Sequence, residues 1–305
     1  MANAIKIEGL TRSYGDDRGV FDLALEVAEQ EVFGFLGPNG AGKTTTIRLM
    51  LDLIRPERGR VSIFGYDSRA DASSVHRITG YLPGEFSLDP KLTGRQLIVY
   101  LANLRGGVEW DHVAKLATRL ELDLSRPFGD YSRGNKQKVG LLQAFMHRPR
   151  LLILDEPTGG LDPLNQEVVL DLVQEAHSNG ATVFLSSHIL SEVEKICHMV
   201  AFIRRGRLLR IGPVHEVLGV RSHHVEAECS RTPDERALAA LPGVRDVRVE
   251  GKKISLVVDG DMQEAIAALS TFHVRQLISR EPSLTDIFLG LYEAEGASDV
   301  QIDLS

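Results

Sequence analysis

Short apolar runs alternate with amphipathic segments over the first two thirds of the chain. Three of these runs predict buried strands: Glu31 to Leu36, Leu151 to Leu154 and Val183 to Leu185. Apolar side chains at helical spacing between residues 41 and 54 predict an amphipathic helix directly after the first strand. Strands and helices that follow one another in this way favour a parallel α/β architecture.

A second helix is predicted to begin at Asp162-Pro163, because aspartate is a favoured N-cap and proline fits the first helical turn. Asn179-Gly180 is a typical stop for that helix. Between these signals, one side of the helix carries the apolar residues Val168, Val169, Leu172, Val173 and Ala176. This segment is therefore expected to pack against the sheet.

The pattern changes after Gly212-Pro213 and Gly219, which suggests a second domain from residue 220 to residue 305. Its predicted elements are strand Val225 to Cys229, helix Pro233 to Leu241, strands Val244 to Val249 and Lys253 to Val258, helix Met262 to Leu269, and strand Val274 to Ser279. The order βαββαβ is that of small α+β ferredoxin-like domains. A last helix, from about Leu284 to Tyr292, is expected to pack on this domain.

The composition indicates a folded protein and argues against several other classes. The chain has 305 residues, 43% hydrophobic and 25% charged, which suits a folded protein of two domains. A net charge of −7 argues against nucleic acid as a partner. Cys197 and Cys229 are too few for a disulfide scaffold and fit a reducing cytosol. No apolar run approaches the ~20 residues of a spanning helix, and the start MANAIKIEGL has no signal-peptide pattern.

A phosphate-binding motif follows the first predicted strand. It matches G-x-x-x-x-G-K-[ST] in full, with the residues Gly37, Pro38, Asn39, Gly40, Ala41, Gly42, Lys43 and Thr44. The glycines allow backbone N–H groups to point at phosphate oxygens. Lys43 brings a charge to the β- and γ-phosphates, and the Thr44 hydroxyl is placed to bind Mg²⁺. Thr45 completes the expected ATP-binding set. The alternative is a chance glycine turn, which the flanking strand and helix disfavour.

Two carboxylates, Asp155 and Glu156, follow the buried strand Leu151 to Leu154. Open α/β sheets bind their ligands at this carboxyl end of the strands. Asp155 is expected to hold Mg²⁺ through water, and Glu156 to polarise the water that attacks the γ-phosphate. Because many strands end in acidic residues, this assignment depends on the phosphate loop that accompanies it.

With these motifs in this order, residues 4–218 resemble the nucleotide-binding subunit of an ABC transporter. The resemblance implies an ABC-type P-loop ATPase domain over residues 1–219, with a helical subdomain at about 84–147. It also implies three roles: Tyr14 stacks on adenine, Asp162 lies in a D-loop at the dimer seam, and His188 is a switch histidine that contacts the γ-phosphate. Lys43, Glu156 and His188 are then the catalytic set.

The roles of Tyr14 and His188 each have a structural alternative. Tyr14 alone would be a half-buried tyrosine at the end of a strand. His188 alone would be a histidine at a helix start, beside the capping-box pattern Ser191-x-x-Glu194.

Two positions depart from the family pattern. Tyr131-Ser132-Arg133-Gly134-Asn135 stands where the family has LSGGQ, so only Ser132 and Gly134 are retained. The resemblance implies that these two residues bind the γ-phosphate held by the other protomer of a dimer. Gly84 stands where the family has glutamine and has no side chain to offer Mg²⁺ or the attacking water. We hypothesise that Glu85 or a water molecule takes over that role.

LPGE, YSRGNKQK and the C-terminal PSLTDIFL are most similar to the daunorubicin/doxorubicin-resistance branch of ABC-2-type exporters. The resemblance implies an Mg²⁺-dependent ATPase that dimerises around two ATP molecules. It would power export of a small molecule, drug or lipid-like compound through a separate multi-span membrane permease subunit. The protein would then act at the cytoplasmic face of the cell membrane, with residues 220–305 as an accessory or regulatory domain.

Two further points stay open at the level of sequence. Residues of the helical subdomain serve either docking on the permease or the subdomain core: Leu92, Leu97, Tyr100, Leu104 and Arg105. The competing functions are a soluble ABC-class ATPase that acts on a non-membrane partner such as ribosomes or DNA, and a regulatory protein that sequesters nucleotide. The intact pair Asp155-Glu156 argues against the regulatory protein.

Overall fold

The computed structural model describes residues 2–15, 18–85, 87–217 and 222–280. The chain divides into two compact units, Met1–Gly212 and Pro213–Ser305. The domain boundary expected at residue 219 and the helix expected from Leu284 to Tyr292 lie outside the described residues. Within the described ranges, every helix is too short or too polar to cross a membrane.

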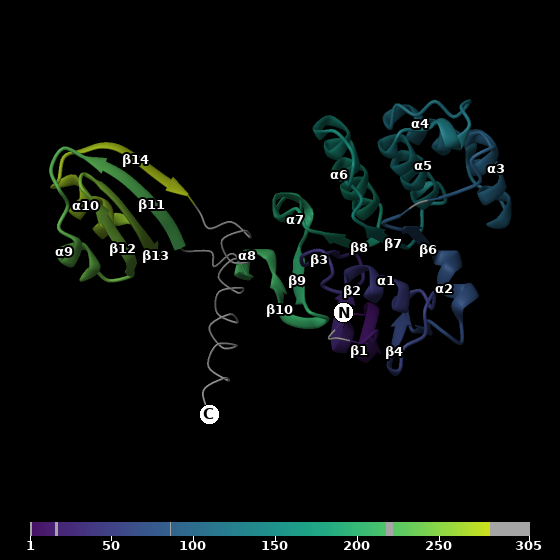
Figure 1. The fold of residues 1–305 in the computed structure, drawn as a ribbon, viewed down its shortest axis with the longest axis horizontal. Helices are drawn as coiled ribbons and strands as arrows, with labels where there is room; N and C mark the ends of the chain where they lie inside the picture. Colours follow the sequence, from purple (N-terminus) through teal and green to yellow (C-terminus); the bar gives the residue numbers. More distant parts are fainter. Residues whose placement is uncertain (1, 16–17, 86, 218–221, 281–305) are drawn as a thin grey trace. The chain divides into compact units, whose positions relative to one another are not determined.

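The first unit mixes strands and helices along the chain (Figure 1). Its strands are β1 (Asn3–Ser13), β2 (Gly19–Ala28), β3 (Val32–Leu36), β4 (Arg58–Ile63), β5 (Tyr66–Asp67), β6 (Thr79–Leu82), β7 (Leu151–Asp155), β8 (Thr182–Ser187), β9 (Met199–Arg204) and β10 (Arg207–Pro213). Its helices are α1 (Lys43–Met50), α2 (Ala72–Ile78), α3 (Gly94–Leu104), α4 (Trp110–Arg119), η1 (Phe128–Asp130), α5 (Arg133–Phe145), α6 (Pro163–Ser178) and α7 (Leu190–Ile196). The short helix α8 (Val214–Val217) follows β10. The three buried strands expected from the sequence are confirmed as β3, β7 and β8.

The central sheet has the strand order β10-β9-β3-β8-β7-β6. Strand β3 pairs in parallel with β8 and β9, and β7 pairs in parallel with β6 and β8. All residues of β3 are buried, and Phe33 stacks on Phe184 of β8 with ring centroids 5.6 Å apart. Full burial of such a ring contributes about 1.5–3 kcal/mol relative to exposure. Burial on both faces explains the apolar runs in the sequence.

The register of this sheet brings three loops to one edge. Leu36, the last residue of β3, pairs with Ser187 of β8, and Asp155, the last residue of β7, pairs with Ser186. Because the strands are parallel, the segments that follow β3, β7 and β8 all leave at their carboxyl ends. The phosphate loop, Glu156 and His188 are therefore neighbours although they are far apart in sequence.

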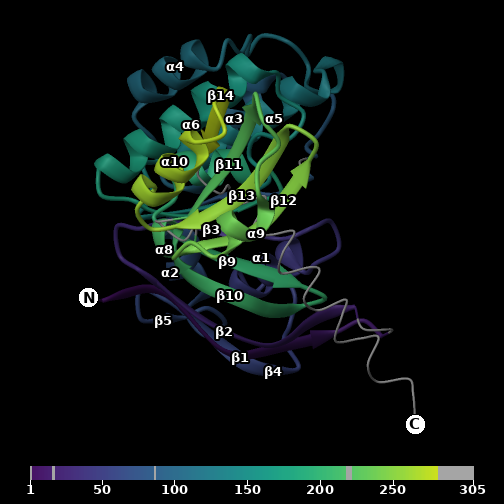
Figure 2. The same cartoon turned by 90° about the vertical axis from the view of Figure 1, so that its left-hand side faces the viewer.

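A second sheet was not expected from the sequence. It is antiparallel, with the order β2-β1-β4-β5 (Figure 2), so a purely parallel architecture is wrong for this part of the chain. Strand β2 alternates buried and exposed positions, and β1 pairs antiparallel with both β2 and β4. Antiparallel neighbours need no crossover helix, so helix-strand alternation is a poor guide here.

The helix boundaries follow local signals. The helix starting at Asp162-Pro163 is confirmed as α6: Asp162 is the N-cap, accepts a 3.0 Å hydrogen bond from the Asn165 N–H, and Asn179 is the C-cap. Helix α1 is shorter than the span 41–54 predicted for it. It ends at Met50, and Asp52 adopts a left-handed backbone with φ of 54°, which no helix interior tolerates.

The capping box at Ser191-x-x-Glu194 does not form. Helix α7 starts at Leu190 with Ile189 as its N-cap, so Ser191 already lies inside the helix. The Ser187 hydroxyl instead accepts a 2.9 Å hydrogen bond from the Ile189 N–H and orders the chain before the helix.

Helices α3, α4 and α5 lie between β6 and β7 in sequence and gather on one side of the first unit (Figure 1). Thr93 and Gln96 form a reciprocal capping box at the start of α3. Some of the helical-subdomain residues considered for docking or for the core are buried, and others are exposed. Leu97 is buried, whereas Tyr100 and Leu104 are 58% and 67% exposed one helical turn apart. Leu92 and Arg105 are partly buried.

The second unit has the elements β11 (Ser222–Cys229), α9 (Glu235–Ala239), β12 (Val244–Glu250), β13 (Lys253–Asp259), α10 (Gln263–Ser270) and β14 (Val274–Arg280). These elements occur in the order that the sequence predicts. The sheet order is β12-β13-β11-β14, and all its paired strands are antiparallel. Val225, Leu256 and Leu269 are buried in one apolar core between this sheet and its helices.

Candidate active site

The phosphate loop connects β3 to α1, and its backbone requires glycine. Gly42, the N-cap of α1, has φ of 107°, and a Cβ there would come within 2.9 Å of the Gly19 carbonyl oxygen. A Cβ at Gly37 would lie only 2.3 Å from the Ile203 carbonyl oxygen. Both positions are too close to neighbouring backbone for any larger residue. The loop can therefore bring its N–H groups, and the start of α1, close to an anion.

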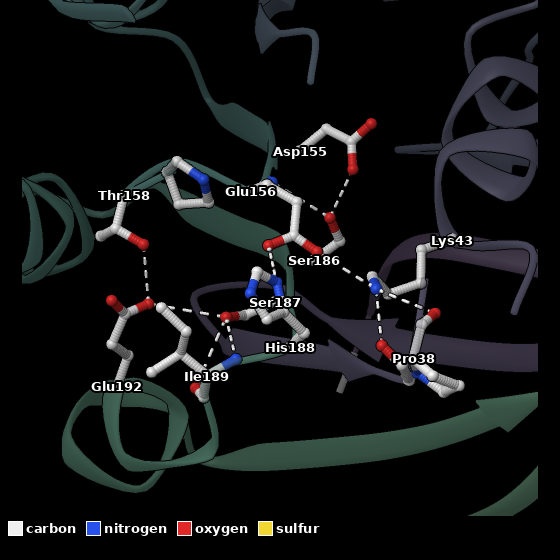
Figure 3. Close-up of polar contacts among 12 residues, drawn as sticks. Pro38, Lys43, Asp155, Glu156, Thr158, Ser186, Ser187, His188, Ile189 and Glu192 are labelled. Atoms are coloured by element: carbon white, nitrogen blue, oxygen red, sulfur yellow. Dashed lines mark hydrogen bonds and ion pairs between the residues drawn. The ribbon is translucent and has the colours of Figure 1, made fainter. Parts of the chain in front are cut away.

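Lys43 is held inside this loop. Its side chain is 6% exposed, and Nζ donates hydrogen bonds of 2.6 Å to the Gly37 carbonyl and 3.3 Å to the Pro38 carbonyl. Nζ also forms a 3.1 Å ion pair with Glu156 Oε1 (Figure 3). The ammonium group is thus fixed between the phosphate loop and the carboxylate after β7, at the place where the bound phosphates are expected.

Asp155 is fully buried and held by hydroxyl groups from two different segments. Thr44 Oγ1 donates a 2.7 Å hydrogen bond to Oδ2, and Ser186 Oγ donates one of 2.5 Å to Oδ1. A hydroxyl and a carboxylate are ligands that suit Mg²⁺, which binds one or two carboxylates together with substrate phosphates. The residues present therefore fit the metal expected from the sequence.

Glu156 is strained and tightly held. Its φ of 52° lies in the left-handed region, which costs a non-glycine residue about 1–3 kcal/mol. Its N–H donates to both the carbonyl and the hydroxyl of Ser186 at 3.2 Å, and its carbonyl accepts a 3.1 Å hydrogen bond from Gln137 Nε2 of α5. These contacts fix the direction of a side chain at the mouth of the loop.

The Glu156 carboxylate lies between two basic groups. Oε1 contacts Lys43, and Oε2 contacts His188 Nδ1 at 2.6 Å (Figure 3). With Glu156 ionised, Nδ1 of the imidazole donates this hydrogen bond. His188 is half-exposed, so its other ring nitrogen remains available to a ligand in front of the loop.

Tyr14 lies at the same cleft. The cleft measures about 480 Å³ and is lined by Tyr14, Arg18, Gly19, Pro38, Asn39, Gly40, Gly42, Lys43, Thr44, Thr45 and Glu156. Tyr14 is 54% exposed, and the Arg12 guanidinium stacks over its ring at 5.3 Å. An exposed ring at the mouth of a phosphate site can stack on a flat base.

The remaining expected residues lie elsewhere. Ser132, Gly134 and Asp162 do not line this cleft. Ser132 is the N-cap of α5, and a Cβ at Gly134 would come within 3.0 Å of the Gly160 carbonyl oxygen. Asp162 is exposed, and hydrogen bonds from the Asn165 backbone and side chain lower the pKa of its carboxyl. The segment around Gly134 therefore packs against the loop before α6.

Gly84 lies beside Asp155, one of the two residues expected to hold Mg²⁺. A Cβ there would come within 3.0 Å of Asp155 Oδ2. Glu85, which was expected to replace the family glutamine, is exposed. Sequence reasoning missed Ser186 and Gln137, which hold Asp155 and Glu156. The only sequence signal for Ser186 was its position at the end of an apolar strand, next to Ser187-His188.

Comparison with known proteins agrees with this geometry. The family model described as ABC transporter matches residues 20–159. The chain is 34% identical over 308 residues to the daunorubicin/doxorubicin resistance ATP-binding protein DrrA of Streptomyces peucetius, covering 94% of this chain and 92% of the relative. This chain belongs to the ATP-binding subunits of ABC transporters. As such a subunit, it is an ATPase whose hydrolysis of ATP is coupled to transport.

Other ATP-binding proteins and a solved structure are also similar to this ABC subunit. It is 40% identical over 215 residues to the bacitracin transport ATP-binding protein BcrA of Enterococcus faecalis, covering 68% of this chain and 69% of the relative. It is 31% identical over 294 residues to the Nod factor export ATP-binding protein I of Rhizobium johnstonii, covering 94% of each. A structure described as the ATP binding subunit of an ABC transporter superposes with a TM-score of 0.65 at 30% identity, covering 70% of this chain and 91% of that one.

Proposed function

We propose that this ABC subunit binds ATP with Mg²⁺ in the cleft at Lys43 and hydrolyses it with Glu156 as general base. The observation that carries the proposal is the position of the Glu156 carboxylate between Lys43 Nζ and His188 Nδ1, at 3.1 Å and 2.6 Å. A positioned carboxylate that accepts a proton from water accelerates hydrolysis by about 10²–10⁴-fold. The left-handed backbone of Glu156 directs it toward the phosphate loop.

Each neighbouring group has a defined task in this proposal. Lys43 exchanges its contacts with the loop carbonyls and Glu156 for phosphate oxygens. Thr44 and Asp155 hold Mg²⁺, which neutralises phosphate charge when bound. His188 keeps the Glu156 carboxylate in place through Nδ1 and presents its second nitrogen to the γ-phosphate. Tyr14 stacks on the adenine ring.

We propose that a second copy of this chain completes the site. Ser132, Gly134 and Asp162 lie outside the cleft of their own chain, yet each is accessible at the start of a helix. A serine hydroxyl, a glycine backbone and a helix N-terminus form an anion site. In a symmetric dimer these groups would close on the γ-phosphate of the partner, so that two ATP molecules are enclosed.

We further propose that a multi-span membrane subunit docks beside the helical subdomain. A groove of about 320 Å³ lies there, lined by Leu51, Leu53, His76, Thr79, Tyr81, Pro83, Arg105 and Gln143. Arg105 donates hydrogen bonds to the carbonyls of His76 and Thr79, and Gln143 donates one to the Tyr81 carbonyl. The exposed pair Tyr100 and Leu104 lies on α3, the helix that ends just before Arg105.

This groove offers a route from the membrane subunit to the metal site. Tyr81 and Pro83 line the groove, and the chain continues from Pro83 directly to Gly84, which lies against Asp155. A segment that enters the groove can therefore displace the backbone next to Asp155. Binding of ATP and of the membrane subunit would in this way influence one another.

The transported compound is proposed from the relatives. Their names state resistance to daunorubicin and doxorubicin, transport of bacitracin and export of Nod factor. We propose that this subunit powers export of a small molecule, drug or lipid-like compound, within the daunorubicin/doxorubicin-resistance branch of ABC-2-type exporters. It would work at the cytoplasmic face of the membrane, attached through its permease.

We propose that the second unit is a ferredoxin-like accessory domain with a regulatory role. Its βαββαβ order, its sheet order β12-β13-β11-β14 and its helices on one apolar core support this fold. The proposed role is to pack across the dimer. A chain truncated after Gly212 is expected to dimerise less well with ATP, and unchanged dimerisation and ATPase rate would contradict the role.

The proposed function is tested by measuring ATP hydrolysis and by co-purification of a membrane partner. Purified protein should release phosphate from ATP in the presence of Mg²⁺, and Lys43→Ala should lose ATP binding. Tagged Glu156→Gln, held with ATP, should co-purify a multi-span membrane protein from gently solubilised membranes. Absence of ATP hydrolysis, or recovery with ribosomal or DNA-bound proteins alone, would overturn the proposal.

A further inference from the structure

Glu192 is a buried carboxyl group on α7 that the mechanism above does not use. Its residue is 8% exposed. Its Oε2 accepts hydrogen bonds from Thr158 Oγ1 at 2.9 Å and from Ser187 Oγ at 3.5 Å (Figure 3). Its Oε1 is also buried and has no hydrogen-bond partner among the described residues. A buried polar atom without a hydrogen-bond partner costs stability, because it has lost its contacts with water.

The two donors flank the catalytic pair in sequence. Thr158 comes two residues after Glu156, in the loop after β7, and Ser187 comes immediately before His188, at the end of β8. One carboxyl oxygen of Glu192 therefore joins the two segments that carry the general base and its histidine. Ser187 also accepts the Ile189 N–H at 2.9 Å, which fixes the turn that carries His188.

We propose that Glu192 is a positioning residue that holds these two loops at the separation at which His188 Nδ1 contacts Glu156 Oε2. The inference rests on the proposed role of Glu156 as general base. Its physical basis is that a catalytic group misplaced by about 1 Å can lose about 10²-fold in rate. Thr158 and Glu192 are both buried, so the link lies inside the fold and is not exchanged for water.

The surroundings of Glu192 raise the pKa of its carboxyl group. Burial raises the pKa of its carboxyl, and the negative charge of Glu156 raises it further, whereas the Thr158 hydrogen bond and His188 oppose these effects. No lysine or arginine forms an ion pair with it in the part of the chain that the structure describes. The side chain of glutamine has the same shape, and its amide oxygen can accept the hydrogen bonds that Oε2 accepts in Glu192. Glutamine should therefore serve in its place.

The experiment measures steady-state ATP hydrolysis by the full chain. Glu192→Ala and Thr158→Val should each lower kcat by about tenfold or more and leave the KM for ATP within about twofold. Glu192→Gln should keep kcat within about twofold of the unaltered protein. Ser191→Ala, an exposed neighbour on the same helix, is the matched control and should change neither value.

A double variant separates a specific link from general damage. Glu192→Ala removes the hydrogen bond from Thr158 and also the one from Ser187, so adding Thr158→Val should make the double variant no slower than Glu192→Ala alone. Additive losses would show that the two residues act independently and would overturn the inference. Thr158→Val keeps the volume of the side chain, so it reports on the bond even if Glu192→Ala folds poorly.

Other outcomes are equally decisive. Unchanged kcat in Thr158→Val, or a loss in Glu192→Gln as large as that in Glu192→Ala, would overturn the inference while leaving the proposed function intact. Loss of the proposed function has a different signature: the unaltered protein would not hydrolyse ATP, or Glu156→Gln would hydrolyse it normally.

Discussion

Gly84 lies directly against Asp155: a Cβ atom on residue 84 would come within 3.0 Å of Oδ2. That oxygen also accepts the Thr44 hydroxyl at 2.7 Å, while Ser186 holds the other carboxylate oxygen at 2.5 Å. Asp155 is fully buried and fixed at both oxygens, so it has little freedom to move away. The absence of a side chain at residue 84 therefore shapes the proposed metal site.

Gly84→Ala should weaken the response to Mg²⁺. The added methyl group would lie about 3.0 Å from Asp155 Oδ2, closer than ordinary contact distance, so the loop or the buried carboxylate must shift. The Mg²⁺ concentration that gives half-maximal ATP hydrolysis should rise by about fivefold or more. An unchanged Mg²⁺ dependence would contradict this prediction and show that the loop before Glu85 moves to accommodate the methyl group without disturbing Asp155.

Glu85 is the residue we hypothesise to replace the missing glutamine of the family. It is exposed and follows Gly84 directly. If its carboxylate assists Mg²⁺ or the attacking water, Glu85→Ala should lower the ATPase rate and the transport rate by about tenfold. Unchanged activity would count against the carboxylate and leave the role to water. Glu109, another exposed glutamate in the first unit, provides a control as Glu109→Ala.

Glu156→Gln should separate ATP binding from ATP hydrolysis. The amide keeps the shape of the side chain but cannot accept a proton from water, so turnover should fall by about 10²-fold or more. Removing the negative charge beside Lys43 also leaves the ammonium free for phosphate, so ATP affinity should be equal or higher. The check is ATP binding by calorimetry, phosphate release, and ATP-dependent dimer formation by size-exclusion chromatography. Normal hydrolysis would remove Glu156 from its role.

The exposed pair on α3 offers a test of membrane-subunit docking. Tyr100→Ala with Leu104→Ala should abolish co-purification of a membrane partner, because exposed apolar side chains are common anchors of interfaces. Basal ATP hydrolysis by the purified subunit should not change, since neither residue lines the cleft at Lys43. Tyr66→Ala, an exposed tyrosine on β5, is the matched control. Undiminished capture by the double variant would move the docking surface elsewhere.

His147 should make stability depend on pH. Burial, with a further contribution from the charge of Arg105, lowers its pKa from 6.5 to about 4, against an opposing hydrogen bond to the Thr79 carbonyl. Between these values the unfolded chain binds a proton that the folded protein does not. Stability is therefore lost as the pH falls from about 6.5 to about 4, by about 3 kcal/mol.

The variant His147→Gln tests this titration. Its amide can still donate to the Thr79 carbonyl but takes up no proton. Between about pH 7 and pH 4.5, its free energy of unfolding in urea should fall less than that of the unaltered protein. The exposed residue His215 serves as control, and His215→Gln should leave the pH dependence as it was. Parallel pH profiles for all three proteins would contradict the prediction.

Several parts of the site could be predicted from sequence because they are local. The phosphate loop is one continuous segment, and its glycines, lysine and threonine act in the order in which they are written. Asp155 and Glu156 follow a strand whose unbroken apolar pattern marks it as buried. The six elements of the second unit and helix α6 were predictable for the same reason: caps, turns and periodicity act over a few residues.

Only the tertiary structure decided which distant residues meet. The hydroxyl of Ser186 reaches Asp155 because β7 and β8 pair in one register, which no local pattern specifies. Strand β1 pairs with β2 and β4 rather than entering the parallel sheet, since the choice of strand partner depends on the whole fold. Tertiary packing likewise places Gly84 beside Asp155 and allows Thr158 to donate a hydrogen bond to Glu192. The sequence by itself determined the chemistry of each segment, and long-range pairing determined their distances.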